Sequence, residues 1–185
     1  EAQLHAHRGW RAAELPTRHL DPVRPTGARR AEGPALAVRH VGDVLVAQGQ
    51  LPDALKAFRD SLAIADRLAK ADPGNAGWQR DLAISNERIG DIASKQGADS
   101  EAKAAFERAL GAYEALVARN PGDLPSLVNS VVPRWRLASL DKANARRHLE
   151  AALGILKPLA AQNRLDEKRS GWIPRIEAQL AALAE

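Results

Sequence analysis

Few residues of this chain have the types and spacing that catalysis or metal binding requires. Cysteine is absent, which excludes thiol nucleophiles and thiolate metal sites. His5 and His7 could both approach a metal ion, but no carboxylate-rich segment adjoins them. Neither the phosphate-binding loop nor the dinucleotide-binding glycine pattern occurs, and Gly74 and Gly122 are typical of turns. We therefore predict that the chain is not an enzyme, holds no metal and needs no cofactor.

The composition favours helices. Hydrophobic residues make up 45% of the 185 positions but aromatic residues only 4%, so much of the apolar content is Ala and Leu, which are good helix formers. No apolar run approaches the roughly 18 residues needed to cross a membrane, and the N-terminal residues lack the apolar core of a secretory signal. We predict an all-α, soluble, cytoplasmic protein. The 27 basic and 23 acidic residues are interspersed, so the excess of positive charge gives little support to nucleic-acid binding.

A repeat of 48 residues organises most of the chain. Shifting the sequence by that distance matches residue types at one register over more than 30 positions, which indicates internal duplication. A third, degenerate copy lays residues 145–163 on 102–120 at a shift of 43, and the five missing residues fall near 140–142. The matching pairs at the shift of 48 include 41–44 with 89–92, Phe58 with Phe106, and 72–75 with 120–123.

Each unit is predicted to contain two helices. In the second unit Trp78, Leu82, Ser85, Ile89 and Ile92 are spaced by three or four residues, which is the period of a helix with one buried face. The second half of the unit has the same spacing. The predicted architecture is therefore helix, turn, helix, turn, repeated along the chain.

Turn residues mark the expected ends of these helices. Gly49 and Gly97 are placed to end the first helix of each unit in the left-handed conformation. Asn75 and Asp123 are placed to cap the helix that begins the next unit, and Ser100 to cap the second helix of its own unit.

The third unit and the two ends of the chain are expected to differ from the regular units. Pro133 should kink or shorten the helix that contains it, and Trp78 and Trp172 are expected to wedge between units as core side chains. Residues 1–34 are rich in Pro and Gly, which predicts an irregular or disordered leader; a basic arm for an acidic partner is the alternative. The predicted repeat domain spans 35–185, with repeats at about 35–74, 75–122 and 123–163 and a closing helix at about 170–184.

The units resemble the tetratricopeptide repeat, which has small residues at its eighth, twentieth and twenty-seventh positions and an aromatic residue at its twenty-fourth. The closing Pro73 and Pro121 come seven residues later than in the usual unit of 34 residues, so the repeat looks like the long-helix bacterial variant that is similar to kinesin light chain repeats. The aromatic residue expected at the fourth position is missing. The matching residues are Gly42, Ala54, Phe58 and Ser61 in one unit and Gly90, Ala102, Phe106 and Ala109 in the next.

The resemblance implies a right-handed superhelix of antiparallel helix pairs, a tetratricopeptide-like α-solenoid with two regular repeats, one degenerate repeat and a capping helix. It also implies a protein-binding scaffold that holds a peptide or a helix on its concave face, and we expect a regulatory segment of a larger bacterial protein. The resemblance places the following partner-binding candidates on the first helix of each pair: Leu36, Arg39, Asp43, Val46, Ala47, Ile84, Glu87, Asp91, Ser94 and Lys95.

Asp43 and Asp91 would make this groove anionic. Family members that bind the C-terminal carboxylate of chaperones use Lys and Asn on these faces, so an anionic groove would repel that ligand. We therefore predict that the chain does not bind such a carboxylate.

Two other functions stay open. One is homotypic oligomerisation, in which the last helix, residues 173–183, packs its apolar face on another copy. The other, less favoured, is nucleic-acid binding through basic residues near the C-terminus, namely Arg134, Arg136, Arg146, Arg147, Arg164, Lys168, Arg169 and Arg175.

Overall fold

The computed structural model describes residues 33–183, so nearly all of the predicted leader, with His5 and His7, lies outside it. Within this range the chain is helical and contains no β-strand, which confirms the predicted all-α class. None of the described helices is both long and apolar enough to span a membrane. The elements are α1 (Pro34–Ala47), α2 (Leu51–Ala71), α3 (Ala76–Lys95), α4 (Asp99–Arg119), α5 (Leu124–Asn129), α6 (Val131–Leu140), the 3-10 turn η1 (Lys142–Asn144), α7 (Ala145–Ala161), α8 (Glu167–Ser170) and α9 (Trp172–Ala181).

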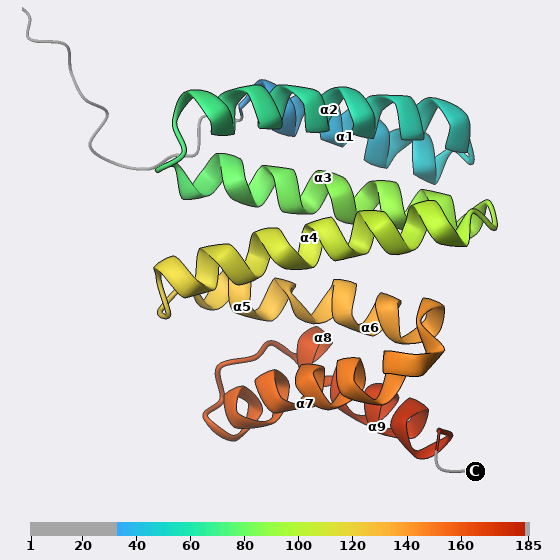
Figure 1. Ribbon diagram of the computed structural model, residues 1–185, viewed down its shortest axis with the longest axis vertical. Coiled ribbons are helices and arrows are strands. Elements are labelled where there is room, and N and C mark those ends of the chain that lie inside the picture. Colours follow the sequence, from blue (N-terminus) through green and yellow to red (C-terminus); the bar gives the residue numbers. More distant parts are fainter. Residues whose placement is uncertain (1–32, 184–185) are drawn as a thin grey trace, which may run out of the picture. The chain divides into compact units, whose positions relative to one another are not determined.

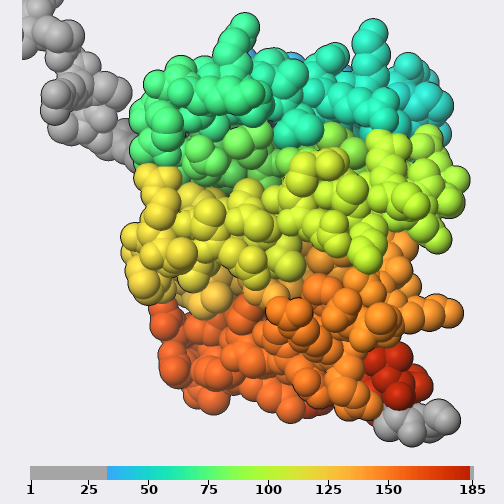
Figure 2. Space-filling model, viewed as in Figure 1, coloured from blue at the N-terminus to red at the C-terminus, as the bar shows by residue number. Residues whose placement is uncertain are grey.

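The long helices pack in the order in which the chain produces them. Helix α1 packs on α2, α2 on α3, and α3 on α4; then α4 packs on α6, α6 on α7, and α7 on α9 (Figure 1). The space-filling view shows the same order as successive bands of colour between α2 and the C-terminal helices (Figure 2). Helices α1, α3 and α6 are therefore equivalent first helices of three pairs, and α2, α4 and α7 are their second helices.

Glycine ends the first helix in the two regular pairs, as predicted. Gly49 follows α1 with φ of +76°, and Gly97 follows α3 with φ of +74°. This left-handed conformation lets the next amide bond back to the helix, so the Ala98 N–H donates to the Ala93 carbonyl at 2.9 Å. Asn163 takes the same conformation after α7, because Asn tolerates it better than most other residues.

Two of the three predicted helix caps are confirmed. The Asn75 side chain accepts the Gly77 and Trp78 N–H groups at the start of α3, and the Asp123 side chain accepts the Ser126 N–H at the start of α5. The prediction for Ser100 is wrong. Helix α4 begins at Asp99 with Ala98 as its N-cap residue, two residues before Ser100, and no side chain caps it.

A glycine-to-phenylalanine contact joins the two helices of each regular pair. A Cβ atom added to Gly42 would lie 2.5 Å from the Phe58 ring, and one added to Gly90 would lie 2.7 Å from the Phe106 ring. Both rings are fully buried. Because a Cβ atom at either glycine would have to displace a buried ring, the helices approach this closely only where the first helix has no side chain.

The third pair keeps the arrangement with different residues. Ala138 and Leu149 stand where the regular pairs have glycine and phenylalanine, and both belong to one buried apolar cluster.

The first helix of the third pair is broken at Ser130 into α5 and α6. Pro133 explains the break, because it has no N–H to donate to the preceding turn. The prediction that Pro133 shortens this helix is confirmed.

Candidate functional site

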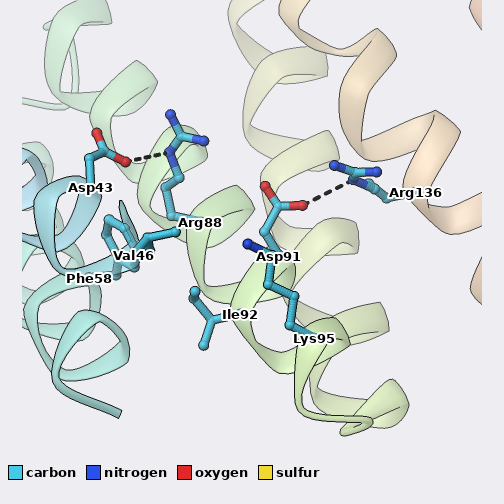
Figure 3. Close-up of a pocket in the computed structure, with 8 residues that line it drawn as sticks. All are labelled: Asp43, Val46, Phe58, Arg88, Asp91, Ile92, Lys95 and Arg136. Carbon is cyan, nitrogen blue, oxygen red and sulfur yellow. Dashed lines mark hydrogen bonds and ion pairs between the residues drawn. The ribbon is translucent and has the colours of Figure 1, made fainter. Parts of the chain in front are cut away.

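A pocket lies on the side of the structure formed by the first helices (Figure 3). Its volume is about 150 Å³, which suits one medium side chain, since a water molecule occupies about 30 Å³ of the liquid. Phe58 and Ile92 are almost fully buried and close its floor, whereas charged side chains form the rim. The residues that line this first-helix pocket are Asp43, Val46, Phe58, Arg88, Asp91, Ile92, Lys95 and Arg136.

Two equivalent ion pairs cross the rim. Arg88 Nε lies 3.2 Å from Asp43 Oδ1, joining α3 to α1. Arg136 Nε donates to Asp91 Oδ1 at 3.0 Å, joining α6 to α3. Figure 3 shows that each carboxylate points toward the arginine of the following first helix. The same contact is thus repeated one unit apart.

The expected anionic groove is wrong. Each aspartate has an arginine beside it, and Lys95 adds a third cationic side chain to the rim. Three cationic groups therefore face two anionic groups. Electrostatic repulsion no longer gives a reason to exclude an acidic partner, although the prediction about the C-terminal carboxylate stays a prediction.

The structure places the ten predicted partner-binding residues in different surroundings. Four of them line the first-helix pocket: Asp43, Val46, Asp91 and Lys95. Ala47 and Ser94 are exposed near the C-terminal ends of their helices, whereas Leu36 and Ile84 are partly buried. The remaining two, Arg39 and Glu87, do not line the pocket; Arg39 is buried and Glu87 is partly buried.

Arg39 joins α1 of the first pair to α3 of the second pair. It is only 6% exposed, and its Nη1 donates to Asp81 Oδ1 at 3.1 Å. A buried guanidinium needs such a partner, because removing a charge from water is costly unless it is paired. Arg39 therefore stabilises the contact of α1 with α3 and does not face a partner.

Glu87 occupies the equivalent position in α3. Burial, and to a lesser degree the nearby Asp91 carboxylate, raise the pKa of Glu87 from 4.5 to about 7. Burial also raises the pKa of Tyr113, and the negative charge of Glu87 adds to that effect. A carboxyl group with a pKa near 7 often marks a catalytic site. Glu87 does not line the pocket, so its position favours a structural role.

The Glu87 pKa predicts a pH-dependent effect of Glu87→Gln on stability. The folded-state pKa exceeds the unfolded value, so the stability that protonated Glu87 contributes is complete below pH 4.5 and is lost as the pH rises through about 7. Glutamine does not ionise. We expect urea unfolding to give equal stabilities for the two proteins at pH 4, and a variant more stable by about 1 to 2 kcal/mol at pH 8. Equal pH profiles would contradict the assignment.

Sequence reasoning missed four residues of the pocket: Phe58, Arg88, Ile92 and Arg136. For two of them, the sequence does contain a signal. Arg88 and Arg136 are separated by the repeat length of 48, as are Asp43 and Asp91, and residues conserved in register through an internal repeat tend to make the same contact.

A second pocket of about 190 Å³ lies beside α6 and α9 and shares Arg136 with the first. The rings of Trp135 and Trp172 are 6.5 Å apart, and the Arg175 guanidinium lies 5.1 Å from the Trp135 ring centre. Trp172 packs against the apolar cluster of the third pair but is only partly buried, so it is not the core side chain that was predicted. Trp78 is also only partly buried.

A third pocket, of about 380 Å³, opens on the side of the second helices. None of the ten predicted residues lines it. Its lining residues come from α2, α3 and α4 and are Arg59, Leu62, Ala63, Asp66, Leu82, Asn86 and Arg108.

The surfaces that would support the two other functions are partly occupied. In α9 Ile176 is fully buried, and Ile173 and Leu180 pack on the same cluster within the chain, so little of the apolar face is left for another copy. Four of the eight basic residues that could bind nucleic acid have acidic neighbours: Arg134 with Glu114 (2.6 Å), Arg136 with Asp91 (3.0 Å), Arg146 with Glu150 (3.7 Å) and Arg169 with Asp166 (2.7 Å).

Within residues 33–183 no group of three or more His, Asp or Glu side chains is arranged to hold a metal ion. Neither a scan against protein-family models nor a search of curated proteins finds a match to this chain.

Proposed function

We propose that this chain is a protein-binding scaffold of the tetratricopeptide kind, in which the stacked pairs form a solenoid and the first helices hold a partner. The observation that carries the proposal is the first-helix pocket. Its lining comes from α1, α2, α3 and α6, so a bound segment would touch all three pairs at once. A preformed surface of this type suits an extended peptide or a short helix.

The lining suggests what the partner presents. Val46, Phe58 and Ile92 offer an apolar floor of one side-chain size, so an aliphatic side chain of the partner is the expected anchor. Asp43 and Asp91 are engaged with arginines, and Lys95 stays on the rim. A carboxylate next to the anchor would therefore be favoured, by a small amount because the rim is in contact with water.

The test uses peptides selected from a random display library on the full chain and measured by calorimetry. Val46→Asp places a charge beside the apolar floor and should weaken binding by at least about tenfold, equivalent to about 1.4 kcal/mol. Lys95→Glu should weaken the binding of acidic peptides by a few fold. The control is Lys56→Glu, which makes the same charge change on an exposed position of α2 outside the pocket and should bind normally.

Circular dichroism and thermal melting establish that each variant is folded. Peptides that bind the Val46→Asp and wild-type proteins equally would refute the pocket assignment. If the library yields no binder to the folded chain, the scaffold proposal itself fails.

A further inference from the structure

The outward side of α1 carries two exposed valines. Val41 and Val44 are each 56% exposed, and within residues 33–183 only Leu183 joins them as an exposed large apolar side chain. Single exposed apolar side chains are common, so the exposure of Val41 and Val44 does not by itself indicate a binding surface. The equivalent residues of the later pairs, in contrast, are buried or partly buried.

The equivalent positions in α3 are Ile89 and Ile92, one repeat length further on. They are 3% and 1% exposed, and they share an apolar cluster with Ala54 and Phe58 of α2. The preceding second helix therefore covers this face of α3.

The third pair repeats the arrangement. The equivalent residues of α6, another 48 positions along the chain, are Leu137 and Leu140. Leu137 is 1% exposed and belongs to a cluster with Phe106 and Leu110 of α4, and Leu140 packs against that cluster. Two of the three first helices thus use the same two positions to receive a preceding second helix.

We propose that the Val41 and Val44 face of α1 docks an amphipathic helix with the chemistry of α2, supplied by a partner. The inference does not depend on the first-helix pocket, which lies against other residues of α1. Three leucines of α2 pack against the cluster that contains Ile89 and Ile92, and their spacing places them on one stripe of the helix. They are Leu51, Leu55 and Leu62. The docked helix should present the same stripe, since it continues an interface that the chain already builds twice.

The probe is a synthetic peptide of residues 50–72, which reproduces α2 and is acetylated and amidated at its ends. We expect fluorescence anisotropy to show saturable binding of the labelled peptide to the full chain. Val44→Asp should weaken it by at least tenfold. Leu183→Asp, which changes the other exposed apolar side chain, should leave it unchanged. A peptide with aspartate at Leu55 and Leu62 should not bind.

Absence of peptide binding to the folded wild-type chain would overturn the proposal, as would binding that Val44→Asp and Leu183→Asp affect equally. Sedimentation equilibrium of the chain alone completes the test. A monomer at all concentrations supports a separate partner helix, whereas a dimer that Val44→Asp dissociates would assign this face to a second copy and overturn the proposal.

Discussion

Replacing Asp123 with alanine is expected to lower the free energy of unfolding by about 3 to 5 kcal/mol, the range observed when one member of a buried ion pair is removed. Asp123 accepts the Ser126 N–H at the start of α5 and receives Arg80 Nη2 at 2.7 Å. Its side chain is 8% exposed and that of Arg80 is 18% exposed. The variant would leave a guanidinium of α3 without its carboxylate and the short helix α5 without its cap.

Asp166 provides a matched control. It also caps a helix, by accepting the Arg169 N–H at 2.8 Å, and it also pairs with an arginine, but its side chain is 53% exposed. Asp166→Ala should therefore cost about 0.5 to 2 kcal/mol, the usual range for a lost cap. Equal losses from the two variants in urea unfolding would show that the α3–α5 ion pair contributes little.

The Asp123 effect should also depend on pH. Burial alone would raise the pKa of Asp123, but hydrogen bonds from Ser126 and Arg80 outweigh it and hold the pKa below its usual value. The stabilisation is then complete above the unfolded pKa of about 3.9 and is lost as the pH falls through the lower folded value. The stability difference between wild type and Asp123→Ala should therefore narrow in acid, below about pH 4.

The second large effect is expected at Gly90. Even a Cβ atom there would lie 2.7 Å from the buried Phe106 ring, so Gly90→Leu should lower stability by about 3 kcal/mol, the upper end of the range for overpacking. Gly111 is the control, because a Cβ added to it would meet nothing within 4 Å in α4. Gly111→Ala should raise stability by up to about 1 kcal/mol, since alanine favours helix formation over glycine.

The third pair suggests how to relieve the clash. Its equivalents of Gly90 and Phe106 are Ala138 and Leu149, which pack in one cluster. Gly90→Ala should therefore destabilise the native protein but cost little in a Phe106→Leu background. A double-mutant cycle should give a favourable coupling of about 1 kcal/mol. Strict additivity would mean that the two residues do not limit each other.

Much of the fold could be predicted because its signals are local or repeat at a fixed distance. The glycine ends at Gly49 and Gly97 and the cap at Asn75 depend only on neighbouring backbone. The error at Ser100 arose because a sequence pattern places the start of a helix only to within one or two residues, and α4 begins at Asp99 after Ala98, whose side chain cannot cap it.

The candidate site could be predicted only in part. Asp43 and Asp91 both line the first-helix pocket, but their electrostatic effect was misjudged. The arginines that neutralise them come from the next pair, Arg88 and Arg136, and that contact depends on how the pairs stack. Arg39 was assigned to the surface for the same reason, because the partner of its buried guanidinium, Asp81, lies in α3 of the next pair.

The most direct test of the scaffold proposal is chemical-shift mapping of a library-selected peptide on the isotope-labelled full chain. We predict that the largest amide shifts fall on residues of the first-helix pocket, including Val46, Asp91, Ile92 and Lys95. Shifts confined to the pocket of the second helices, around Leu62 and Asn86, would contradict the proposal.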